Sequence, residues 1–84
     1  MGDVLVKRGT IEEGRITTLT VGFDGLPDRD IDRTTAIAWM RDGHSLVPLT
    51  NGQRGSALLL VEADEATLVI RADADKVGED SLPF

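Results

Sequence analysis

The chain has 84 residues, no cysteine and a formal net charge of −6. This length allows one small folded domain, and the lack of cysteine excludes disulfide bonds and thiolate metal sites. Residues 1–72 hold 8 basic and 11 acidic side chains, a balance that disfavours strong nucleic-acid binding through phosphates. Charged residues interrupt the first twenty positions, so we expect neither a signal peptide nor a membrane span, no membrane partner and a cytoplasmic location.

The first predicted element is a β-hairpin. Residues 4–11 read as a strand, and the turn that follows contains Gly14, which can adopt a positive φ. In residues 15–23, large apolar side chains alternate with small or polar ones. This period of two is typical of a strand with one buried face.

Residues 33–41 fit two structures. As a helix, the segment begins after Asp32, whose side chain can cap it, and ends at Gly43 in a left-handed conformation. As a hairpin, residues 35–40 pair with residues 45–49 across a two-residue turn at Asp42-Gly43. Two alanines in the segment and Pro48 in the second arm favour the helix, which is our prediction.

Three more strands are predicted in the second half of the chain. Residues 46–49 form a short strand, and Pro48 favours an edge position for it. Residues 57–61 and 67–70 form the arms of a second hairpin, and their continuous apolar character indicates burial on both faces.

These elements predict an α+β fold: an antiparallel sheet of about five strands with one helix on one face, in the order ββαβββ. A small all-β barrel of six strands is the alternative. The second face of the sheet is available to another copy of the chain, so the predicted fold also allows a homodimer.

The chain changes character after residue 72, where large apolar side chains become rare and acidic ones common. We therefore expect a single folded domain over residues 1–72 and a flexible acidic tail over residues 73–84. The last six residues read Glu79-Asp80-Ser81-Leu82-Pro83-Phe84.

This ending resembles the acidic C-terminal tail of bacterial single-stranded DNA-binding proteins, which closes on Ile-Pro-Phe or Leu-Pro-Phe. The resemblance covers the tail alone, and Ser81 stands where that family prefers another acid. In that family the tail recruits replication and repair proteins. The resemblance therefore implies a protein partner from the DNA replication or repair machinery, bound through Glu79, Asp80, Leu82, Pro83 and Phe84.

Physical chemistry is consistent with such docking. Pro83 restricts the backbone, so less conformational freedom is lost when the segment binds. Phe84 offers a ring to a pocket and, as the last residue, a carboxylate to a basic neighbour. The leading hypothesis is a non-enzymatic binding or adaptor module.

Two alternatives use other residues. A minimal single-stranded nucleic-acid-binding protein would stack bases on aromatic rings and hold phosphates with basic side chains. Its contact residues would be Phe23, Trp39, Lys7, Arg8, Arg15 and Arg54. In the second alternative, the acidic surface inhibits a basic protein partner.

Catalysis and metal binding are disfavoured. The chain has one histidine, no cysteine and no tyrosine, so most side chains that transfer protons near neutral pH are missing. The densest carboxylate cluster lacks the glycine and glutamate that a calcium loop requires; it consists of Asp24, Asp28, Asp30 and Asp32. We expect no metal and no cofactor.

Overall fold

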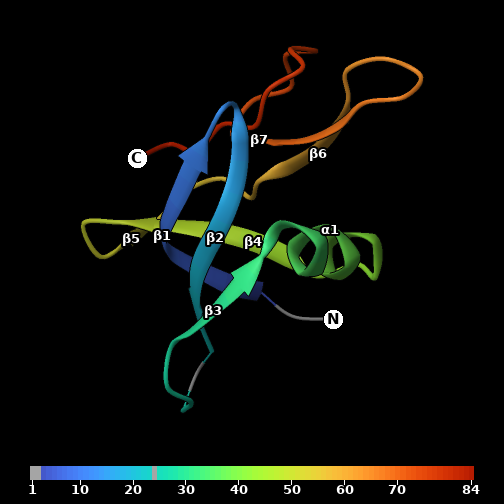
Figure 1. Cartoon of the computed structure of the whole chain (residues 1–84). Helices are drawn as coiled ribbons and strands as arrows, with labels where there is room; N and C mark the ends of the chain where they lie inside the picture. The colour runs from blue at the N-terminus through green and yellow to red at the C-terminus, as the bar shows by residue number, and fades with distance from the viewer. Residues whose placement is uncertain (1–2, 24) are drawn as a thin grey trace.

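The computed structural model describes residues 3–23 and 25–84, and Figure 1 shows the whole chain. Strands β1, β2, β3, β4 and β5 form one sheet in the order β3-β2-β1-β4-β5, and β6 and β7 form a separate two-stranded sheet. One helix, α1, lies between β3 and β4 in the sequence. In chain order the elements are β1 (Asp3–Glu12), β2 (Arg15–Gly22), β3 (Arg29–Asp32), α1 (Arg33–Arg41), β4 (Ser45–Thr50), β5 (Gln53–Arg54), β6 (Leu59–Glu62) and β7 (Leu68–Arg71).

The predicted first hairpin is confirmed. β1 and β2 pair antiparallel, with Glu12 opposite Arg15 at the turn. The two turn residues, Glu13 and Gly14, have φ values of 52° and 76°. Positive φ at both central positions gives the turn a twist that matches the flanking strands.

The helix prediction is also confirmed. The Asp32 side chain accepts a hydrogen bond from the backbone N–H of Thr35 at 2.8 Å, as an N-cap does. Gly43 follows the helix with a φ of 94°, and Ala36 is the buried residue of the helix. The hairpin alternative for this segment is therefore wrong.

The predicted antiparallel sheet is corrected to a mixed one, because β4 pairs with β1 in parallel. β4 is not an edge strand, since β5 lies on its other side. Pro48 is tolerated there because the backbone group that it contributes to hydrogen bonding is its carbonyl, which accepts from the N–H of Gly55 at 2.8 Å. Over the described residues the sheet stays open between β3 and β5, so it is not the six-stranded barrel.

The second hairpin is present as the β6–β7 sheet, with Leu60 opposite Ile70. Burial on both faces holds for β7 only, because Leu59 in β6 is 42% exposed. The sequence pattern did not anticipate that this hairpin would form a sheet of its own.

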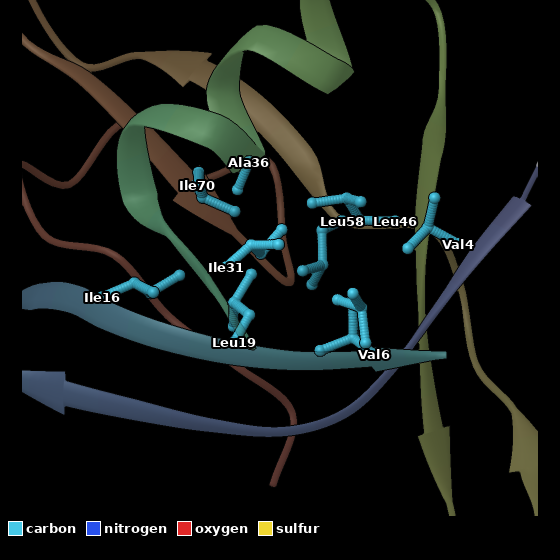
Figure 2. Packing of buried hydrophobic residues seen from close by; sticks show 10 residues of the cluster. Val4, Val6, Ile16, Leu19, Ile31, Ala36, Leu46, Leu58 and Ile70 are labelled. Atoms are coloured by element: carbon cyan, nitrogen blue, oxygen red, sulfur yellow. The ribbon is translucent and has the colours of Figure 1, made fainter. Parts of the chain in front are cut away.

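The core lies between the five-stranded sheet on one side and α1 with β7 on the other. Figure 2 shows Leu19 and Val6 from the large sheet pointing toward Ala36 and Ile70. Leu46 and Leu58 complete the centre of this cluster. No helix in the described part of the chain has the length and apolar character needed to cross a membrane.

Candidate functional site: the acidic C-terminal segment

The acidic segment is held against its own domain at Asp80. The residue is 5% exposed, and its carboxylate accepts four hydrogen bonds. Backbone N–H groups of Ile16 and Ile70 donate at 2.7 and 3.0 Å. The Arg33 guanidinium donates through Nε at 2.7 Å and Nη2 at 3.1 Å. A carboxylate with this set of donors is a structural anchor.

These donors also fix the ionisation of Asp80. Burial is the largest single influence and by itself would raise the pKa of the carboxyl group. The hydrogen bonds from Arg33, Ile16 and Ile70 together outweigh it, so the pKa of Asp80 is lowered. The residue therefore carries its negative charge inside the fold at neutral pH.

The same segment covers the outer edge of β7. The N–H of Ser81 donates to the carbonyl of Ile70 at 2.9 Å, and the Ser81 hydroxyl accepts from the N–H of Ala72 at 3.0 Å. Arg33 Nη2 satisfies the carbonyl of Leu68 at 2.6 Å. The Asp80 carboxylate accepts from the N–H of Ile70. Along this edge, Leu68, Ile70 and Ala72 therefore all have hydrogen-bond partners.

Two further contacts tie the segment to the β1–β2 turn and to β7. The N–H of Asp80 donates to the carbonyl of Gly14 at 2.8 Å. Arg71 donates from Nη1 to the carbonyl of Glu79 at 2.8 Å while its Nε binds Asp73 at 2.7 Å. Hydrogen bonding to Asp73 raises the pKa of Arg71, so this clamp remains charged.

Leu82 packs next to Gly9 of β1. A Cβ atom at Gly9 would lie 2.5 Å from Leu82 Cδ1 and 2.8 Å from Leu19 Cδ2, so a side chain at this position would require both leucine side chains to shift. Leu82 is partly buried against the core. In Figure 1 the chain accordingly returns past β7 and ends beside the tip of β1.

The contacts divide the predicted partner-binding residues into two groups. Residues 79–82, which we call the anchored segment, pack on the domain, although the Glu79 side chain is exposed. Pro83 and Phe84, which we call the exposed pair, project from it, and Phe84 is 48% exposed. In this arrangement Asp80 and most of Leu82 are not available to another molecule.

The residues predicted to contact nucleic acid fall into an aromatic group and a basic group. Phe23 and Trp39 meet edge to face with ring centroids 5.8 Å apart, and His44 packs on Trp39 at 6.5 Å. Together with Val4 they line a cavity of 250 Å³. Arg29, which the sequence did not single out, lies 6.0 Å from the centre of the Trp39 ring.

In the basic group, the side chains of Lys7, Arg15 and Arg54 bind other groups of the domain. Lys7 Nζ lies 2.8 Å from Asp28, and Arg54 Nη1 lies 3.2 Å from Asp3. Arg15 donates to the backbone carbonyl of Gly78 in the acidic segment, while Arg8 is exposed on β1. Lys7, Arg15 and Arg54 are thus tied to different parts of the molecule.

The aspartates of the carboxylate cluster have separate structural roles. Asp28 pairs with Lys7, Asp30 accepts from the Thr20 hydroxyl at 2.7 Å, and Asp32 caps α1. Asp24 lies outside the described residues. Across residues 3–23 and 25–84, no group of three or more His, Asp or Glu side chains is placed to hold a metal ion.

The sequence did not reveal the groups that donate hydrogen bonds to Asp80. Two of its donors are backbone groups, so no side-chain pattern identifies them. One signal was present: Arg33 is the first residue of α1, where the helix dipole disfavours a cation unless an acid is close. Comparison with protein-family models, curated proteins and solved structures found no match.

Proposed function

We propose that this chain is a non-enzymatic, cytoplasmic binding module whose exposed pair docks on a DNA-processing protein. The observation that carries the proposal is the accessible Phe84 ring, 48% exposed, beyond a segment that the domain itself fixes. The similarity of the last six residues to the tails of single-stranded DNA-binding proteins suggests the class of partner.

Anchoring favours this mode of binding energetically. A free tail of twelve residues would lose conformational entropy along its whole length when it docks. Here the backbone is already held at Asp80 and Ser81, so mainly the exposed pair has to be ordered. The expected partner surface is a pocket that accepts an aromatic ring, with basic side chains toward Glu79.

A competition assay tests the proposal. A fluorescent peptide with the sequence of residues 78–84 is bound to a repair or replication protein that holds the tail of a single-stranded DNA-binding protein, and the full chain is added as competitor. We expect the wild-type chain to displace the peptide. Phe84→Ala should weaken displacement by about tenfold or more, the effect of removing an aromatic anchor.

Leu26→Ala is the matched control, because it removes an apolar side chain that is 64% exposed in a different loop. It should displace the peptide as well as the wild type does. If the wild-type chain fails to displace the peptide, or if Phe84→Ala and Leu26→Ala behave alike, the proposal is refuted.

A second candidate function rests on a different observation, the aromatic cavity. Phe23 and Trp39 share it, and a ring-lined cavity beside Arg29 could stack a base of single-stranded nucleic acid. The ion pairs of Lys7 and Arg54 and the net charge of −6 weigh against it. We rank it second for this reason.

A further inference from the structure

Three arginines converge on the acidic C-terminal segment, although the chain as a whole carries a net charge of −6. They come from different elements, because Arg15 begins β2, Arg33 begins α1 and Arg71 ends β7. Arg33 binds the Asp80 carboxylate, and the other two donate to backbone carbonyls of the two preceding residues. Clusters of arginine are a common means of recognising acidic peptides. We call the surface formed by these arginines and by the groups that contact residues 80–82 the arginine groove.

The arginine groove makes a different contact with each of three consecutive residues. Asp80 accepts hydrogen bonds from two backbone N–H groups and from a guanidinium group. At the next position, the edge of β7 binds both the N–H and the hydroxyl of Ser81. At the third position, the lack of a side chain at Gly9 leaves space for Leu82. The groove therefore matches the sequence Asp-Ser-Leu in a peptide that lies along a strand edge.

The peptide in the groove is connected to the rest of the chain through an exposed stretch. Residues 73–79 are all exposed, and a Cβ atom at Gly78 would meet no atom of the described chain within 4 Å. The walls of the groove come from β2, α1 and β7, and each of these elements has backbone hydrogen bonds of its own. Residues 80–82 are therefore bound as a ligand is bound, by contacts at three positions on a surface that other parts of the fold build.

We propose that the arginine groove is a binding site for an acidic segment, of the sequence Asp-Ser-Leu, in another protein. The chain's own anchored segment is then an intramolecular competitor for this site. The partner is another protein rather than a second copy, because each copy already fills its own groove and exchange between copies adds no hydrogen bond. The inference goes beyond the proposed function: there the chain supplies a peptide to a partner, and here it receives one.

Competition by the chain's own segment determines the apparent affinity of the groove. A ligand on a short linker has an effective concentration in the millimolar range, so a foreign peptide must compete with about that concentration in the wild type. A substitution within the anchored segment weakens the competitor and leaves the groove unchanged. Such a variant should therefore bind a foreign peptide more tightly than the wild type does.

Fluorescence anisotropy with a labelled peptide tests the proposal. The peptide has the sequence of residues 77–82 with an amidated C-terminus. The full-length Asp80→Ala chain should bind it about tenfold or more tightly than the wild-type chain, because the competing segment has lost its anchor. A control peptide with Asp80→Asn keeps the shape of the side chain and removes its charge. It should bind about tenfold or more weakly, the effect of losing hydrogen bonds to a charged group.

A second variant keeps the test valid if Asp80→Ala does not fold. Leu82→Ala shortens a side chain that is only partly buried and keeps the Asp80 anchor, and it should also bind the peptide more tightly than the wild type does. Leu26→Ala is the control, since it shortens an exposed leucine in a different loop, and it should bind like the wild type. A peptide that binds neither segment variant, binds the wild type equally well or tolerates Asp80→Asn would overturn the proposal.

Amide NMR signals show where the peptide binds. When the peptide is added to isotope-labelled Asp80→Ala, the N–H signals of Ile16 and Ile70 should return toward their wild-type positions, because the carboxylate of the peptide replaces the missing one. Changes confined to residues outside the groove would contradict the proposal, and a wild-type chain that sediments as a dimer with exchanged segments would overturn the choice of partner. The peptide lacks the exposed pair, so failure of this proposal is distinguishable from failure of the proposed function.

Discussion

Replacing Asp80 by alanine should destabilise the fold strongly, although the residue lies only four positions before Phe84. The substitution removes the acceptor of four hydrogen bonds, two of them from backbone N–H groups of Ile16 and Ile70. Hydrogen bonds to a charged group contribute about 1.5–3 kcal/mol each. The Arg33 side chain is 25% exposed and can regain water, so most of the loss comes from the two amides.

We therefore expect the free energy of unfolding to fall by about 3 kcal/mol. The loss should not be larger, because the anchored segment can detach from the domain and let water reach the two amides. For a domain of this size the loss corresponds to a fall in Tm of about 15 °C. Urea unfolding followed by circular dichroism measures it. Asp75→Ala is the control, because it removes the same charge from an exposed position of the same stretch. Equal stability of the two variants would refute the reasoning.

Three further predictions follow from the contacts. Because folding lowers the pKa of Asp80, the contribution of this residue to stability is present above the ordinary pKa of about 3.9 and is lost as pH falls through the lowered value. The stability difference between wild type and Asp80→Asn should therefore shrink below about pH 4. A difference that stays constant with pH would contradict this prediction. Leu46→Ala, at a site with 0% exposure, should cost about 3 kcal/mol in urea unfolding, whereas a loss no greater than that of Leu26→Ala would contradict the assigned core. Titration with a single-stranded oligonucleotide should leave the Trp39 emission unchanged, because the chain carries a net charge of −6 and Lys7 and Arg54 are paired with aspartates. Saturable quenching that weakens with salt would favour the second candidate function.

Local patterns predicted the elements whose structure is determined by neighbouring residues. Alternation of side chains and the Glu13-Gly14 turn specify the first hairpin, and Asp32 with Gly43 delimits the helix. Each of these features depends on residues close in sequence. Sequence reasoning is reliable for such features because the physical cause is local.

The missed features depend on residues far apart in the chain. Parallel pairing of β1 with β4 leaves no mark on either strand's alternation, and β3 contains only Ile31 as a buried residue, so it reads as a polar loop. Asp80 is the clearest case among the candidate site residues. An acid in a polar stretch predicts solvent exposure, but the donors that bury it come from Ile16, Arg33 and Ile70.

Backbone relaxation of residues 73–84 measured by NMR tests the central claim most directly, because that claim is a segment fixed by its own domain ahead of an exposed pair. Residues 79–82 should show order parameters near those of the strands, about 0.85, whereas Phe84 should fall below about 0.6. A steady rise in mobility from residue 73 to the end, with no rigid stretch at Asp80, would contradict the account.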